Sequence, residues 1–149
     1  MSADIAVDPR DFTPEALASI APACADCSDG QVTMVGGSAV YPHRPDLADK
    51  WLWRCSCGAY CGVHPGTLKA LGSPAGPVTR RARSAAHAAF DPLWEKRQRL
   101  SGLSKGHARG KGYKWLAAQL GVEPKNCHIG MMDAATARRV VEICRRAEA

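Results

Sequence analysis

The sequence predicts a small α+β protein, with an N-terminal zinc ribbon of short antiparallel strands packed with three to four C-terminal helices. Two closely spaced cysteine pairs, Cys24-Ala25-Asp26-Cys27 and Cys55-Ser56-Cys57, flank a segment of 27 residues that has strand-like stretches. The later part of the chain is rich in alanine and arginine at helical spacing. The length of 149 residues indicates a single domain, or one small metal-stabilised module followed by a helical module.

The spacing of the cysteines is typical of a structural zinc site. Zn²⁺ prefers four tetrahedral nitrogen or sulfur ligands, and we predict as its ligands Cys24, Cys27, Cys55 and Cys57. The second pair is one residue shorter than the usual C-x-x-C, so Cys61 or His64 could replace one of the four. A local site of Cys55, Cys57, Cys61 and His64 is therefore an alternative, as is the absence of any metal. Seven cysteines are an odd number, which argues against a secreted disulfide framework.

Three segments follow from the composition: an acidic tail with a short helix (1–22), the zinc-ribbon module (23–72) and a basic helical module (73–149). In the first, Thr13-Pro14-Glu15 begins a helix, because threonine caps well and proline suits the first position. In the second, alternating apolar residues predict strands at 31–35, 39–41, 50–54 and 59–63, and Thr67 begins a short helix to Leu71.

The helical module is predicted in four parts. A helix over 78–90 is restarted by Asp91-Pro92 and continues to Leu100, and a glycine-rich basic loop spans 101–112. A short helix over 113–120 ends at Gly121, a left-handed cap. Asp133 then caps a last helix that runs to about Ala147.

Charge is unevenly distributed, and this predicts an anionic partner. Residues 1–49 carry a balance of −6, whereas residues 50–122 carry +11 within a total of +6. We predict that nucleic acid, DNA or RNA, or an acidic nucleoprotein partner contacts the basic helix and loop through Arg80, Arg81, Arg83, Lys105, Arg109, Lys111 and Lys114. Tyr113 and Trp115 beside this loop could stack on unpaired bases, or Trp115 could belong to the core.

No apolar run of 18 residues occurs, and the N-terminus carries acids rather than a basic signal region. We therefore expect no membrane association and a cytoplasmic, reducing location.

Four blocks carry a resemblance to a known family: Val40-Tyr41-Pro42-His43-Arg44-Pro45-Asp46-Leu47, Cys57-Gly58-Ala59-Tyr60 with His64-Pro65-Gly66-Thr67, Ala86-His87-Ala88-Ala89-Phe90-Asp91-Pro92-Leu93-Trp94, and Tyr113-Lys114-Trp115-Leu116-Ala117 with Cys127-His128-Ile129-Gly130-Met131. Residues 24–146 resemble small zinc-finger-containing proteins of unknown function, encoded mostly by bacteriophages, prophages and bacteria. The resemblance implies a zinc ribbon followed by helices, in a bacterial host cell, and implies no particular reaction. The family pattern has C-x-x-C where this chain has Cys55-Ser56-Cys57.

These observations favour a non-catalytic zinc protein that binds nucleic acid or a nucleoprotein complex. One alternative is a phage-type interaction module that engages a host protein through exposed Trp51, Trp53 or Trp94. A less favoured alternative is a metal-dependent nuclease that uses some of the five histidines, none of which has an acid at a recognisable catalytic spacing. The oligomeric state is left open by the sequence.

Overall fold

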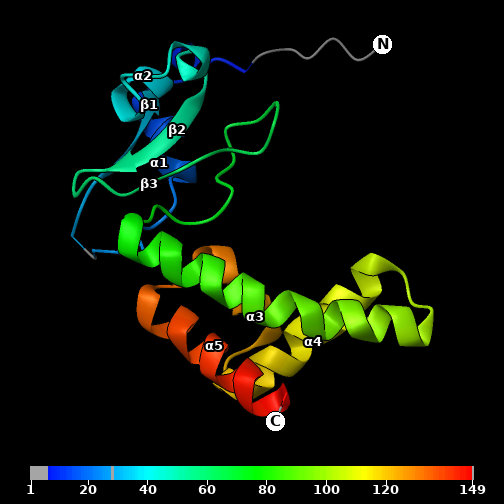
Figure 1. Cartoon of the computed structure of the whole chain (residues 1–149). Coiled ribbons are helices and arrows are strands. Elements are labelled where there is room, and N and C mark those ends of the chain that lie inside the picture. Colours follow the sequence, from blue (N-terminus) through cyan, green and yellow to red (C-terminus); the bar gives the residue numbers. More distant parts are fainter. Residues whose placement is uncertain (1–6, 28, 149) are drawn as a thin grey trace. The chain divides into compact units, whose positions relative to one another are not determined.

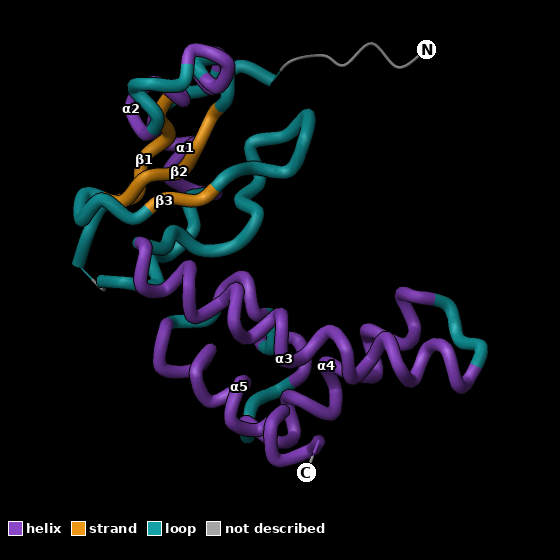
Figure 2. Tube along the Cα trace, viewed as in Figure 1, coloured by secondary structure: helices purple, strands orange, loops and turns teal. Residues whose placement is uncertain are grey.

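A computed structural model describes residues 7–27 and 29–148 of the chain. Contacts divide the chain into two compact units, Met1–Gly76 and Pro77–Ala149. The first unit contains all the strands of the described residues, and the second consists of helices and their connections (Figures 1 and 2).

The first unit is organised by an antiparallel sheet of three strands in the order β1-β2-β3. These are β1 (Val32–Gly36), β2 (Trp51–Cys55) and β3 (Tyr60–Cys61). Trp53 lies opposite both Met34 and Cys61 and is buried, so its large side chain is the centre of this small core. The predictions of strands at 31–35, 50–54 and 59–63 are confirmed to within a few residues.

The predicted strand at 39–41 is wrong, because the chain forms the short helix α2 (Gly37–Val40) there. Gly37 explains the difference. An added Cβ at this position would lie 1.7 Å from the carbonyl oxygen of Leu47, so the two segments approach as closely as only glycine allows. The N–H of Tyr41 then donates to the carbonyl of Gly37 and closes the helical turn.

Further turns complete the first unit. They are the 3-10 turns η1 (Pro9–Asp11) and η2 (Pro45–Leu47), and the helix α1 (Pro14–Ile20), which Thr13 caps as predicted. The predicted helix from Thr67 to Leu71 is absent. The Thr67 hydroxyl donates to the carbonyl of His64 and accepts from the N–H of Lys69, which forms a turn between the bridged residues Val63 and Ala70.

The second unit consists of three helices around one core. These are α3 (Pro77–Ser101), α4 (Lys105–Leu120) and α5 (Ala134–Glu148), with the 3-10 turns η3 (Pro124–Asn126) and η4 (Ile129–Met131) between the last two helices. Small and large side chains alternate in the core, where Phe90, Leu116, Ile129 and Val140 are fully buried beside several alanines. The predicted caps Gly121, with φ of 72°, and Asp133, which accepts from the N–H of Thr136, are confirmed.

Two predictions about these helices are wrong. Helix α3 does not restart at Asp91-Pro92 but continues through Pro92. Phe90 and Trp94 lie one turn apart on the buried face of the helix. Burying both side chains requires a continuous helix, and this outweighs the tendency of Pro92 to break it. The Asp91 carboxylate does not cap the helix, and instead accepts from the indole N–H of Trp94 at 3.0 Å.

The second error concerns the basic segment 101–112, which is helical from Lys105 rather than a mobile loop. Ser104 caps the start of α4 by accepting from the N–H of His107. Gly112 lets α4 approach α3, because an added Cβ there would lie 3.0 Å from Cβ of Trp94 and 3.1 Å from Cζ of Phe90. Within the described part of the chain, no helix has the length and apolar character needed to span a bilayer.

Candidate functional site

The most clearly built site is a cluster of four cysteines at one end of the sheet. Cys55 is the last residue of β2, and its thiol meets that of Cys27 at 3.4 Å, while the thiols of Cys24 and Cys57 lie 3.7 Å apart. All four sulfur atoms lie within 4.8 Å of one another. A tetrahedral Zn²⁺ with Zn–S bonds of about 2.3 Å separates its sulfur ligands by about 3.8 Å. The cluster therefore has the dimensions and the soft ligands that zinc requires.

Backbone amides face these thiols. The N–H of Asp26 donates to the sulfur of Cys24 at 3.3 Å, the N–H of Gly30 to that of Cys27, and the N–H of Cys57 to that of Cys55. Such bonds stabilise thiolates, and they fix each cysteine pair in a tight turn. The shortened pair Cys55-Ser56-Cys57 is compatible with this arrangement, because Gly58 reverses the chain with φ of 100°.

The cluster perturbs the pKa values of its thiols. The pKa of Cys27 is raised to about 12, chiefly because its thiol donates to Cys55. Burial acts to raise the pKa of Cys55, but bonds from the Cys57 amide and the neighbouring thiols lower it to about 7. Hydrogen bonds between the sulfur atoms thus couple the protons of these thiols to one another. A bound cation would displace these protons, since metals bind cysteine as thiolate.

Two residues that support the cluster were missed by the sequence reasoning. Gly30 packs directly on it, because an added Cβ would lie 2.2 Å from the sulfur of Cys55 and 2.6 Å from that of Cys27. Asp26 links the first cysteine pair to the segment around Gly76, which is 50 residues away in the sequence. Its carboxylate accepts a hydrogen bond from the N–H of Gly76 at 2.8 Å. A glycine three residues after C-x-x-C was a visible signal, whereas the partner of Asp26 had none.

The alternative ligands do not join the cluster. Cys61 is buried on β3, where its thiol donates to the carbonyl of Gly72 at 3.8 Å, and His64 is exposed. Over residues 7–27 and 29–148, the four cysteines are the only group of three or more His, Cys, Asp or Glu side chains with ligand atoms in mutual reach. The histidines are dispersed: His87 lies 3.6 Å from Asp91, His107 contacts Ser104, and His128 packs on Tyr113.

The basic residues singled out from the sequence fall into two groups on the second unit. Arg80, Arg81 and Arg83 lie in the first turns of α3, where the guanidinium of Arg83 donates to the carbonyl of Met132 at 2.7 Å. Arg83 thus serves internal packing. Lys105, Arg109, Lys111 and Lys114 are exposed along α4. The guanidinium of Arg109 lies 5.7 Å from the ring centre of Tyr113.

Helix pairing brings the cations at the end of α3 beside the α4 cations that were predicted as site residues. The end of α3 and the start of α4 lie side by side and extend together beyond α5 (Figure 1). Lys96, Arg97 and Arg99 therefore join the cations of α4 on one projection. We call residues 96–114 the basic hairpin; it contains seven Lys or Arg residues and no Asp or Glu. Treating 101–112 as a loop concealed this pairing.

Two of the three tryptophans that were expected to be exposed are buried. Trp53 and Trp94 are core residues, with exposed fractions of 1% and 5%, so they are not available to a partner. Trp51 is half-buried, with the guanidinium of Arg10 at 5.8 Å from its ring. Trp115 is half-buried against the helical core.

A four-cysteine cluster at the end of a small antiparallel sheet is the arrangement of a zinc-finger protein. The chain belongs to the family of zinc-finger-containing domains, whose model matches residues 20–147. This match confirms the resemblance to zinc-finger-containing proteins drawn from the four sequence blocks, whereas the bacteriophage or bacterial origin stays a prediction. Searches of the curated proteins and of the solved structures found no significant match.

Proposed function

We propose that this protein is a non-catalytic nucleic-acid-binding protein in which one structural Zn²⁺ holds the first unit and the basic hairpin contacts phosphates. The observation that carries the proposal is the density of unpaired cations. Residues 96–114 hold seven Lys or Arg without an acid, and among the described residues none of the seven forms an ion pair. Neutralising phosphates supplies most of the affinity of such surfaces for nucleic acid.

The zinc is assigned a structural role, with ligands Cys24, Cys27, Cys55 and Cys57. Four thiolates close the coordination sphere, which leaves no position for a reacting water. The first unit has a thin core centred on Trp53 and Leu52, so it depends on further stabilisation. Binding of a structural zinc supplies about 10–16 kcal/mol in small zinc-finger peptides, and this becomes folding free energy. Zinc thiolates of this kind persist in a reducing, cytoplasmic compartment.

The helical form of the hairpin supports the proposal better than a mobile loop would. Its cations are held on two packed helices, so binding orders little additional backbone. Two glycines of α4, Gly106 and Gly110, leave no side chain on the surface between the cations. Gly106 and Gly110 face open space, which lets a phosphate backbone approach closely.

The test is equilibrium binding of a labelled oligonucleotide at several salt concentrations. Replacing Lys105, Arg109 and Lys111 together with alanine should weaken binding at least tenfold and reduce the salt slope by about 2, since each lost phosphate contact contributes about 0.7–0.9. The matched control replaces Arg138, Arg139 and Arg145, three exposed arginines of α5, and removes the same charge. Equal loss in both triple variants, or no loss in either, would contradict the role of the hairpin.

A second candidate is a protein-interaction module, and a groove in the first unit favours it. A cavity of about 420 Å³ lies between η1, α1 and the sheet, lined by Phe12, Leu17, Met34 and Trp51. Phe12 is 46% exposed, so part of this apolar side chain is open to a partner at the groove. If this second candidate is right, the protein binds one partner protein with an affinity that does not depend on salt, and Phe12→Ala abolishes that binding. Retained capture of that protein by Phe12→Ala would sink this candidate.

A further inference from the structure

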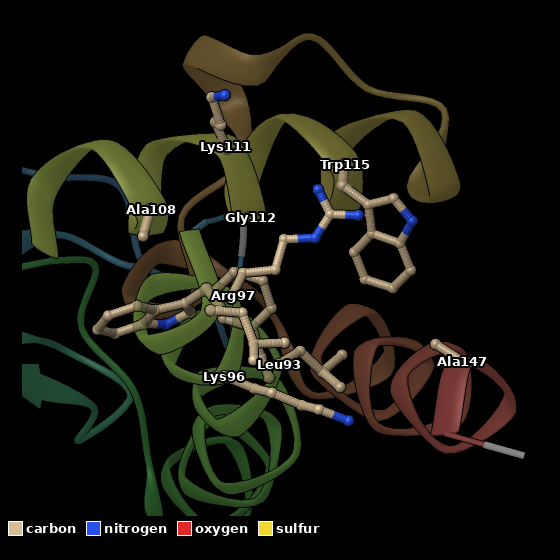
Figure 3. Close-up of a pocket in the computed structure, with 11 residues that line it drawn as sticks. Leu93, Lys96, Arg97, Ala108, Lys111, Gly112, Trp115 and Ala147 are labelled. Atoms are coloured by element: carbon tan, nitrogen blue, oxygen red, sulfur yellow. The ribbon is translucent and has the colours of Figure 1, made fainter. Parts of the chain in front are cut away.

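A second cavity, of about 420 Å³, lies in the helical unit at the base of the basic hairpin. Its lining comes from α3, α4 and the end of α5, and includes Leu93, Trp115 and Ala147 (Figure 3). Leu100 also lines it. Leu100 is 79% exposed, so the apolar lining opens to solvent. The volume lies within the ~300–1,000 Å³ range of small-ligand pockets.

Two flat groups face this cavity from different helices. Trp115 is half-buried against the helical core and also lines the cavity. Arg97 is exposed on α3, and its side chain extends across the cavity toward the indole of Trp115 (Figure 3). Indole and guanidinium planes are the surfaces on which proteins stack unpaired nucleobases.

The charges around the cavity select the same kind of occupant. Lys96, Arg97 and Lys111 line it, and no acidic side chain does. Within the part of the chain that the structure describes, these cations have no carboxylate partner. The cavity therefore suits a ligand with a flat, weakly polar body and attached negative charge. A base in a duplex is stacked on both sides and cannot enter such a cavity without being unpaired.

We propose that this cavity takes an unpaired base of single-stranded nucleic acid, stacked on Trp115 beside the Arg97 guanidinium, while the adjoining phosphates meet Lys96 and Lys111. The inference rests on the proposed function and makes it more specific, since it assigns single strands rather than duplexes as the ligand. An acidic peptide would satisfy the cations but would make no use of two facing planar groups, so it is the less favoured occupant.

The experiment compares the affinity of the full zinc-loaded protein for a 20-nucleotide oligo(dT), for a 20-bp duplex and for an oligoglutamate peptide, at one salt concentration. We expect binding to oligo(dT) at least tenfold tighter than to the duplex, with quenching of tryptophan fluorescence. Trp115→Leu should weaken oligo(dT) binding by roughly 5- to 150-fold, the value of one base–aromatic stack, and leave duplex binding unchanged. The matched control is Trp51→Leu, which replaces a half-buried tryptophan of the first unit. It should change neither the affinity for oligo(dT) nor the affinity for the duplex.

Arg97→Lys is a second test variant that does not depend on the folding of Trp115→Leu. Arg97 is exposed, and the substitution keeps the positive charge while removing the planar guanidinium group. It should weaken oligo(dT) binding several-fold without altering the salt slope. Equal affinity for single strand and duplex, with Trp115→Leu and Arg97→Lys both neutral, would overturn the inference while leaving the hairpin as a phosphate-binding surface. Tighter binding of oligoglutamate than of oligo(dT) would overturn it in favour of an acidic partner. Absence of binding to both nucleic acids would overturn the proposed function itself.

Discussion

The contacts at Gly112 show how a single hydrogen atom in place of a side chain controls the packing of two helices. An added methyl group would press on Cβ of Trp94 and on the ring of Phe90 at about 3 Å, and both neighbours are buried. We predict that Gly112→Ala lowers the free energy of unfolding by about 1–3 kcal/mol, the usual cost of overpacking. Denaturant unfolding followed by far-UV circular dichroism measures this.

Gly110 offers the matched control, since it lies on the same helix and an added Cβ meets nothing within 4 Å. Alanine is a better helix former by about 0.5–1 kcal/mol, so Gly110→Ala should stabilise the protein by that amount. If both variants moved stability in the same direction, the close packing at Gly112 would not be the cause.

Asp133 carries a pH dependence that follows from its place at the start of α5. Hydrogen bonds from Thr136, through its side chain and its backbone N–H, lower the pKa of this carboxyl below its usual value of 3.8. A lowered pKa in the folded state means that the carboxylate stabilises the protein above about pH 4, and that this contribution disappears as pH falls through the folded pKa. Asp133→Asn should therefore be less stable than the natural chain at pH 7, by about 0.3–1 kcal/mol.

The difference between these two proteins should shrink as the pH falls below about 4, and vanish once the carboxyl is protonated in the folded state as well. Because both proteins have the same cysteines, acid release of metal affects them equally and cancels in the comparison. Thermal unfolding from pH 7 to pH 3 tests this. A difference that stayed constant with pH would exclude the carboxylate charge as its source.

Helix α3 is the element in which local preference and packing disagree. Pro92 lacks the N–H that would bond to the carbonyl of Ala88, yet α3 runs unbroken from Pro77 to Ser101. Pro92 is exposed, so its ring contributes little to the core. We predict that Pro92→Ala raises the free energy of unfolding by about 1–3 kcal/mol. Replacement of exposed Ala88 by serine, a control on the same helix, should change it by less than about 0.7 kcal/mol. An unchanged or lower stability of Pro92→Ala would mean that α3 needs its proline.

Elements with local signals were the ones the sequence predicted well. Thr13, Gly121 and Asp133 act as caps where their residue types place them, and the period of two at Trp51 and Trp53 marked a strand. Two of the errors came from contacts with another segment of the chain. Neither the approach of Gly37 to Leu47 nor the burial of α4 against α3 has a signature within its own segment.

The candidate site likewise combines residues that have a local sequence signal with residues that have none. The four cysteines were identifiable because zinc ligands carry a spacing, and the structure brings their sulfur atoms together. The cavity beside Trp115 was not identifiable, because its lining comes from α3, α4 and α5, and a lining side chain looks like a core or surface residue in the sequence.

At the scale of the whole molecule, each unit has its own source of stability. The helical unit has an extended core that includes Phe90, Leu116 and Val140, whereas the first unit relies on a small core and the cysteine cluster. Removal of metal by a strong chelator should therefore unfold the first unit and leave most of the helical signal intact. Circular dichroism and proteolysis of the chelated protein would show this. Loss of the whole helical signal together with the metal would contradict two separately stabilised units.

The most direct test of the central claim is to measure the metal content and the reactive thiols of protein purified without added metal. We predict one zinc per chain, and loss of the metal in Cys27→Ser but not in Cys61→Ala. In Cys61→Ala, which lacks the buried fifth thiol of the first unit, four thiols should become reactive only when zinc is removed. Zero zinc or two zinc ions per chain, or full zinc content in Cys27→Ser, would contradict the assignment of Cys24, Cys27, Cys55 and Cys57 as a single structural zinc site.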